Sequence, residues 1–543
     1  MDLFFAFIMA LGVTTVLIPP LRRMAERFNV IDQPSSRKVH THPVPRVGGL
    51  AMFVGVVIPA WLWLEATPQL IAFTAAAAVL LVLGAVDDRY DLDYRIKFAG
   101  QIVAVGLVVF VGDVRIETFT LDAREPIPQW LSGPLTVLFL LGVTNAINLA
   151  DGLDGLAGGT TLLCLGAIGL IAYAGGNLYV CTLAAAIGGA ILGFLRFNTY
   201  PARIFMGDAG SQFLGFSVGV LSVLTTQDPA MPVSAGLPLL LLGLPIIDTL
   251  LVMVQRIIEH RSPFVADRNH IHHRLLGLGF EHHEAVVLIY LLQCALFLSA
   301  YFLRFESDVL IVTVFGTLTL GATVLLYVAR QRAWRWRHPQ AGGRRSLITR
   351  QIKWLRAPER LPHWTFLFLG WCVPMYSGYV ISHASGVTTD LGVLALSLLA
   401  FGVVLLPWMW SRDLGWLERG VIYVAAALVV YLDQTSVTDA STGRLIFFAL
   451  LAAAVIVNLR LSGERRFEVN PLDVLVLFIA LVIPNLPGSF GLPPGLALGI
   501  GKLIVLLYAI EMLLSARLRW NVPRAVVGIV LTALVLRSLL PVL

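Results

Sequence analysis

The strongest constraint on this chain is a repeated pattern of long apolar segments separated by short polar loops, which runs through most of the sequence. A helix needs about 20 apolar residues to cross the hydrocarbon core of a bilayer. Charged residues make up only 13% of the chain, whereas soluble domains carry about 25%. The polar surface is therefore too small to cover soluble cores. We expect an all-α integral membrane protein, a polytopic helical bundle.

The apolar segments predict about 18 transmembrane helices in two groups, 11 followed by 7. The first group is expected near 3–21, 48–64, 69–86, 98–111, 135–150, 157–174, 178–196, 210–225, 235–257, 285–303 and 309–329, and the second near 364–382, 390–410, 420–432, 444–459, 471–486, 496–515 and 524–541. Residues 1–330 then form one membrane domain and residues 364–543 another. Residues 331–363 are rich in Arg and Trp, and we interpret them as a basic linker on the cytoplasmic headgroups.

Basic residues divide unequally between the two sides of this arrangement. An N-terminus outside the cell puts 25 Lys and Arg of the first group and the linker on one side, and only Arg115, Arg124 and Arg304 on the other. Cytoplasmic loops carry the excess of Lys and Arg, so the basic side is predicted to be cytoplasmic. The net charge of +6 is spread over successive loops, and we expect no nucleic-acid partner.

Acidic and amide side chains gather where helices meet the cytoplasm. Asp87 and Asp88 end one apolar segment, and Lys97 follows. A solvated helix end is the simple alternative for such a pair, because an ionised Asp at the bilayer centre costs about 3 kcal/mol.

The segment TNAINLADGLDGLAGG carries Asn145, Asn148, Asp151 and Asp154. Asn145 and Asp154 would face opposite sides of an ideal helix. If all four serve one site, the helix must break, and the glycines within DGLDG permit a break.

Two further polar clusters lie on the same side. Asp208 stands at a predicted helix start in FMGDAGS, where backbone N–H groups can face an anion, although an N-cap is the alternative. Later, His270, His272 and His273 stand beside Arg268 and Arg274. Zinc is one interpretation of the histidines, but no cysteine accompanies them, and imidazole with guanidinium suits phosphate better.

The clusters together indicate one chemistry. Carboxylates alone repel a phosphate, but a divalent cation between them can hold a diphosphate, and Mg²⁺ prefers one or two carboxylates with phosphate and water. The pattern predicts Mg²⁺-assisted phosphoryl transfer. A soluble diphosphate would enter from the cytoplasm, and the second substrate would arrive from the bilayer.

Five segments in order carry a family resemblance over roughly residues 1–330: PVPRVGG ending at Gly49, DDR at 87–89, NAINLADGLDGL at 145–156, FNTYPARIFMGDAGS at 197–211 and SPFVADRNHIHHRLLGLGF at 262–280. The sequence resembles the polyprenyl-phosphate N-acetylhexosamine-1-phosphate transferases, also called glycosyltransferase family 4. This family includes phospho-N-acetylmuramoyl-pentapeptide transferase. The interrupted histidines of HIHH are similar to those of the N-acetylglucosamine branch, the WecA-like enzymes.

The resemblance implies transfer of N-acetylglucosamine 1-phosphate from UDP-N-acetylglucosamine to undecaprenyl phosphate, a polyprenyl phosphate lipid acceptor, with release of UMP. It implies a bacterial inner-membrane enzyme with its active site on the cytoplasmic face, dependent on Mg²⁺ or on Mn²⁺. It assigns catalytic roles to Asp87, Asp88, Asp151, Asp154 and Lys97, substrate binding to Arg46, Asn145, Asn198, Arg203, Arg268, His270, His272 and His273, and metal binding to Asp208 and Asn148.

Other interpretations remain open at this point. The donor can be another UDP-N-acetylhexosamine or a muramyl-pentapeptide nucleotide, and a homodimer is a further hypothesis. A non-enzymatic transporter of lipid-linked glycans would place polar residues at mid-membrane in several spans, and here they gather at one surface. The second group of spans has no predicted function, and its acidic residues, such as Asp433, are interpreted as solvated helix ends.

Overall fold

The computed structural model describes residues 2–28, 30–33, 43–121, 123–231, 233–260, 270–332, 334, 360–384, 387–405, 415–435, 442–461, 496–515 and 522–539. These residues are mostly helical, with two antiparallel pairs of short strands. Ten of the described helices are long and apolar enough to cross a membrane. A helical protein with many spans is thereby confirmed. The span expected near 471–486 lies outside the described residues, so the number 18 stays a prediction.

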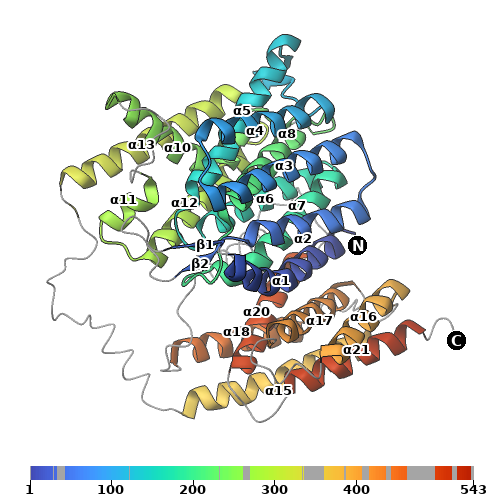
Figure 1. Ribbon diagram of the computed structural model, residues 1–543. Coiled ribbons are helices and arrows are strands. Elements are labelled where there is room, and N and C mark those ends of the chain that lie inside the picture. The colour runs from blue at the N-terminus through green and yellow to red at the C-terminus, as the bar shows by residue number, and fades with distance from the viewer. Residues whose placement is uncertain are drawn as a thin grey trace. The chain divides into compact units, whose positions relative to one another are not determined.

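The described chain divides into two compact units, with the boundary close to residue 341. The helices of the first unit are α1 (Asp2–Phe28), α2 (Gly48–Trp63), α3 (Pro68–Tyr90), α4 (Tyr94–Gly106), the π-helix η1 (Leu107–Val111), α5 (Gln129–Ala150), α6 (Leu156–Ala174), α7 (Leu178–Asn198), α8 (Gly207–Thr226), α9 (Pro238–Leu241), α10 (Gly243–Ile258), α11 (Ile271–Gly277), α12 (His282–Phe302) and α13 (Asp308–Gln331) (Figure 1). Its strands are β1 (Ile31–Asp32), β2 (Val44–Pro45), β3 (Thr118–Thr120) and β4 (Arg124–Pro126).

One expected span is interrupted. The segment near 235–257 forms α9 and α10, with a break at Leu242. Pro245 has no N–H to donate to the carbonyl of Leu241. That carbonyl instead accepts a hydrogen bond from Nε2 of Gln293 in α12, at 2.8 Å. The break therefore exchanges a bond within a helix for one between helices.

Helix α8 occupies the centre of the first unit, where it packs against α2, α3, α5 and α6. The approach of α3 is close because Gly84 has no side chain. A Cβ at that position would lie 2.3 Å from Cα of Ala209 in the first turn of α8. This contact brings the end of α3, with its two aspartates, against the start of α8, with Asp208.

The far end of α8 is held by one arginine. The guanidinium of Arg124, in β4, donates to the carbonyls of Thr226 at 2.9 Å, Asp228 at 3.1 Å and Val233 at 3.1 Å. A cation at a helix C-terminus satisfies the last carbonyls and complements the helix dipole. Arg124 therefore fixes the end of α8 that lies farthest from Asp208.

The second unit is a bundle of α15 (Arg360–His383), α16 (Thr389–Leu405), α17 (Gly415–Thr435), α18 (Thr442–Leu461), α20 (Leu496–Ser515) and α21 (Val522–Leu539). The interpretation of Asp433 as a solvated residue is wrong. Asp433 in α17 is 2% exposed and pairs with the ammonium of Lys502 in α20, which is 4% exposed. The helix register turns both side chains inward, so each neutralises the other.

Replacing Lys502 with Met should lower the free energy of unfolding by about 3–5 kcal/mol, because it removes the ammonium that pairs with the buried Asp433 carboxylate. The measurement is the thermal unfolding of the full chain in one detergent. Arg22→Met is the matched control, since the Arg22–Glu26 pair at 3.1 Å has both side chains about half exposed. An equal change in the two variants would contradict the buried pairing, whereas removing both charges with Asp433→Leu and Lys502→Met should restore much of the loss.

Candidate active site

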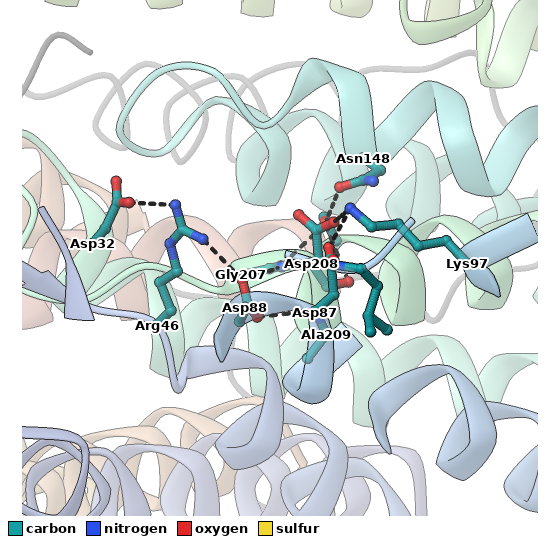
Figure 2. A network of polar contacts seen from close by, with 11 residues as sticks. Asp32, Arg46, Asp87, Asp88, Lys97, Asn148, Gly207, Asp208 and Ala209 are labelled. Carbon is teal, nitrogen blue, oxygen red and sulfur yellow. Dashed lines mark hydrogen bonds and ion pairs between the residues drawn. The ribbon is translucent and has the colours of Figure 1, made fainter. Parts of the chain in front are cut away.

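One ammonium group joins the acidic residues of two helices (Figure 2). Nζ of Lys97 lies 2.5 Å from Oδ2 of Asp87 and 3.7 Å from Oδ2 of Asp208. The carboxylate of Asp87 also accepts from the backbone N–H of Leu92 at 2.7 Å. The ends of α3 and α8 therefore present two carboxylates side by side, with a single cation between them.

The local sequence explains how Lys97 returns to Asp87. Helix α3 ends at Tyr90, and the left-handed backbone of the C-cap residue Asp91 (φ 51°) turns the chain. Asp93 then caps α4 by accepting from the N–H of Arg95 at 2.7 Å. Lys97 consequently lies in the first turn of α4, within reach of the carboxylate at the end of α3.

Asp88 occupies the anion position at the start of α8. Its Oδ1 accepts from the N–H of Asp208 at 3.1 Å, and its Oδ2 from the N–H of Ala209 at 3.4 Å. The guanidinium of Arg46 lies 3.4 Å away, and the Asp88 side chain is 1% exposed. The expected anion at this helix start is thus a carboxylate of the protein itself. Asp88 visibly positions α8, and its role toward a lipid phosphate stays a prediction.

The PVPRVGG segment is tied to the loop before α8. The N–H of Phe205 donates to the carbonyl of Pro45 at 2.8 Å, and the N–H of Gly48 donates to the carbonyl of Phe205 at 2.9 Å. Arg46 lies between Asp88 and the buried Asp32, and it pairs with both (Figure 2). Asp32 is not among the predicted site residues. The sequence feature that could have identified it is its isolation, because Asp32 is the one acidic residue between Glu26 and Glu65.

The expected break in the second motif is present. Helix α5 ends at Ala150 and α6 begins at Leu156, with Gly155 in a left-handed conformation (φ 80°). Oδ1 of Asn148 accepts from Oγ of Ser211 at 2.7 Å, so this amide lies beside the first turn of α8.

Asn145 has a different environment. Its Nδ2 donates to Oε1 of Gln101 at 2.8 Å, and Gln101 in turn donates to Gln212 at 3.1 Å. Both glutamines are almost fully buried. This network ties α4, α5 and α8 together, and neither glutamine is among the predicted residues. The sequence feature that could have identified them is a polar amide side chain within an apolar segment.

Two predicted residues join the loops around DGLDG. Oδ2 of Asp154 accepts from the N–H of Ala202 at 2.8 Å. Asn198 accepts from the N–H of Gly155 and donates to the carbonyl of Ile204, both at 2.9 Å, and is 2% exposed. The visible role of Asn198 is to hold the two loops together, and its contact with substrate stays a prediction.

Asp151 is half-buried beside these loops. Loss of solvent, followed by the negative charges of Asp88 and Asp154, raises the pKa of its carboxyl to about 7, although the positive charge of Arg46 acts in the opposite direction. A group with this pKa takes up and loses a proton near neutral pH.

The histidine segment packs on the DGLDG turn. His272 is 3% exposed, and a Cβ at Gly152 would lie 2.2 Å from its Nε2. Burial, followed by the charge of His273, lowers the pKa of His272 to about 3, so its ring is neutral. The ring centroids of His272 and His273 lie 4.3 Å apart.

Two further predicted residues are arginines. Arg203 is exposed on the loop that precedes α8. Arg268 lies outside the described residues.

The side-chain atoms at the start of α8 that are suited to bind a metal ion are all oxygens. They belong to the carboxylates of Asp87 and Asp208 and to the amide of Asn148. Within the part of the chain that the structure describes, no group of three or more His, Cys, Asp or Glu side chains is arranged to hold a metal ion. A cation here would need ligands from water and substrate, and this is the coordination that Mg²⁺ favours. The pairing of both carboxylates with Lys97 already shows that the position attracts positive charge.

Comparison with known proteins gives these residues a context. Residues 70–226 match the family described as glycosyl transferase family 4, a range that includes Asp87, Asp151 and Asp208. The chain is also 39% identical over 305 residues to a probable undecaprenyl-phosphate N-acetylglucosaminyl 1-phosphate transferase of Bacillus subtilis, and this alignment covers 84% of that protein and 55% of this chain. The chain belongs to glycosyl transferase family 4.

Two other family members show the same pattern. An undecaprenyl-phosphate alpha-N-acetylglucosaminyl 1-phosphate transferase of Escherichia coli K12 is 32% identical over 329 residues, which cover 89% of that protein and 59% of this chain. A decaprenyl-phosphate N-acetylglucosaminephosphotransferase of Mycolicibacterium smegmatis is 36% identical over 310 residues, 74% of that protein and 50% of this chain. The family predicted from the five motifs is confirmed.

Proposed function

We propose that this protein transfers N-acetylglucosamine 1-phosphate from UDP-N-acetylglucosamine to undecaprenyl phosphate and releases UMP. The product would begin a lipid-linked envelope glycan, such as an O-antigen. The observation that carries this proposal is the Asp87–Lys97–Asp208 arrangement at the start of α8. It lies in a chain whose relatives are named for this transfer.

The proposed reaction is one displacement at phosphorus. An oxygen of the lipid phosphate attacks the β-phosphorus of the donor and forms a new P–O bond. The bond from that phosphorus to the oxygen bridging the two phosphates breaks, and UMP leaves with this oxygen. The attacking oxygen is already anionic, so catalysis consists mainly of positioning and of neutralising charge.

Each cluster has a task in this scheme. Asp87, Asp208 and Asn148 would hold Mg²⁺, or Mn²⁺ in its place, and the bound cation would neutralise the negative charge of the diphosphate. Lys97 would keep the two carboxylates in position and contribute a second positive charge.

Residues around this centre would hold the substrates. Asp88 would hold the start of α8 in register through the backbone of Asp208. The histidine segment would lie along the donor, whose soluble nucleotide reaches the site from the cytoplasm. The excess of basic residues on that side of the inner membrane supports this direction of entry.

The test uses the full chain in phospholipid vesicles that contain undecaprenyl phosphate. UMP release is measured with UDP-N-acetylglucosamine, UDP-N-acetylgalactosamine and the UDP-muramyl-pentapeptide, each with Mg²⁺, with Mn²⁺ and with a chelator. We expect release with UDP-N-acetylglucosamine and a metal, and none with chelator. Faster UMP release from another donor would assign that donor as the substrate. No release from any donor would refute the proposal.

A chain that ends at Gly343 should retain activity. The alignments with the relatives cover 84–89% of those proteins with 305–329 residues, and all five motifs end by Phe280. Because few contacts cross a linker between domains, turnover per folded molecule should stay within about threefold of the full chain. UMP release, normalised to the monodisperse fraction, measures this. A truncated chain that is well folded but makes no lipid product would place the second unit in the catalytic machinery.

A further inference from the structure

We propose that Asp248 of α10 is a positioning residue for the donor site: it fixes the orientation of His270 and the start of the segment that follows. This proposal rests on the proposed function and extends it to a residue that the motifs do not contain. Asp248 lies within α10, 22 residues before His270, which immediately precedes α11.

Both oxygens of the Asp248 carboxylate are engaged by the histidine segment. Oδ2 lies 2.9 Å from Nδ1 of His270, and Oδ1 accepts from the backbone N–H of Ile271 at 2.7 Å. Asp248 and His270 are each 6% exposed. The carboxylate therefore holds the ring of one residue and the backbone of the next, away from competing water.

The Asp248 contact determines which ring atom of His270 meets a ligand. A carboxylate on Nδ1 favours the proton at that nitrogen, and Nε2 remains as the polar atom of the ring that is left for a ligand. His270 stands immediately before α11 and its side chain makes no capping bond, so Asp248 also supplies the missing acceptor at this helix start.

Fixing His270 also fixes its neighbours. The rings of His270 and His272 are stacked with centroids 5.7 Å apart, and His272 packs on Gly152 in the DGLDG turn. Asp248 thereby sets the distance between the histidines and the turn that carries Asp151. Loss of this restraint should weaken binding of the nucleotide donor and leave binding of the lipid acceptor unchanged.

The experiment compares donor kinetics of Asp248→Asn, Asp248→Glu, His270→Ala and the Asp248→Asn/His270→Ala double variant in the full chain. UDP-N-acetylglucosamine is varied at saturating undecaprenyl phosphate and Mg²⁺, and then the lipid is varied. We expect Asp248→Asn to raise the donor KM about tenfold or more, with the lipid KM unchanged. Asp248→Glu should recover part of the loss. The double variant should be no worse than His270→Ala alone, because both changes remove one interaction.

Asp308→Asn is the matched control. The Asp308 carboxylate is equally rich in hydrogen bonds, accepting from the N–H groups of Thr120 in β3 and of Gly236 before α9, both at 2.6 Å. Neither of these partners is a predicted site residue. It should lower stability without raising the donor KM.

Three results would each overturn the role of Asp248. The donor KM could be unchanged in Asp248→Asn, the effects of the two single changes on the donor KM could multiply in the double variant, or the donor KM could rise equally in Asp308→Asn. If Asp248→Asn does not fold, a normal donor KM in His270→Ala would overturn it. A wild-type chain that releases no UMP would instead overturn the proposed function, and the role of Asp248 with it.

Discussion

Replacing Asp208 with Asn should lower the rate of UMP release by at least about 100-fold, while the protein stays folded. The substitution keeps the size of the side chain but removes the charge that Lys97 contacts at 3.7 Å and that a divalent cation would need. Since the side chain is about one-third exposed at the start of α8, the change should cost little stability. The loss should therefore appear in catalysis and in the dependence on metal.

The measurement is the initial rate of UMP release across a range of Mg²⁺ concentrations. Asp113→Asn is the matched control, because the Asp113 side chain is 75% exposed and its positive φ of 53° is a conformation that Asn tolerates. Near-normal turnover of the Asp208 variant at saturating Mg²⁺ would refute the metal-binding role.

Replacing Gly207 with Ala should reduce transfer by about 100-fold, because a displacement of about 1 Å in a catalytic group has an effect of this size. Gly207 has a φ of 69°, a left-handed conformation, and a Cβ there would lie 2.2 Å from Oδ2 of Asp88. The Asp88 carboxylate, held by the N–H groups of Asp208 and Ala209, would have to move. The start of α8 would then lose its alignment with Asp87.

Gly142→Ala in α5 separates this effect from a general cost of adding a methyl group, since a Cβ at Gly142 has no atom within 4 Å. Rates and thermal unfolding are compared for both variants, and added Mg²⁺ should not rescue the Gly207 variant. Full activity after Gly207→Ala would show that the contact between Asp88 and α8 does not matter for the reaction.

Local pattern was sufficient to predict most of the long helices, but not the break between α9 and α10. The break within DGLDG could be predicted because two glycines stand where a continuous helix would separate Asn145 from Asp154. The meeting of Asp87 with Asp208 could be anticipated as well, because the sequence predicts that both residues lie at helix ends on the same side of the membrane. The residue types alone were enough to predict metal-assisted phosphoryl transfer, without any knowledge of the distances between the residues.

Pairings between distant segments could not be predicted in this way. Asp248 looks like a stray acid in an apolar helix, and only the packing of α10 brings it to His270. Asp433 lies near a helix end in the sequence, yet its partner Lys502 is 69 residues away, and the helix register decides that both face inward. Such contacts depend on tertiary packing, which spacing along one helix does not encode.

Helix α8 is closed by Asp88 at its start and by Arg124 at its end, and almost every side chain between them is buried. Most residues of α13 are exposed, and an exposed helix is free to tilt in bilayers of different thickness, which is the usual response to hydrophobic mismatch. Helix α8 has almost no surface on which lipid can act. The depth of Asp208 is therefore set by contacts within the protein, so the reacting groups should keep their spacing when the thickness of the surrounding bilayer changes.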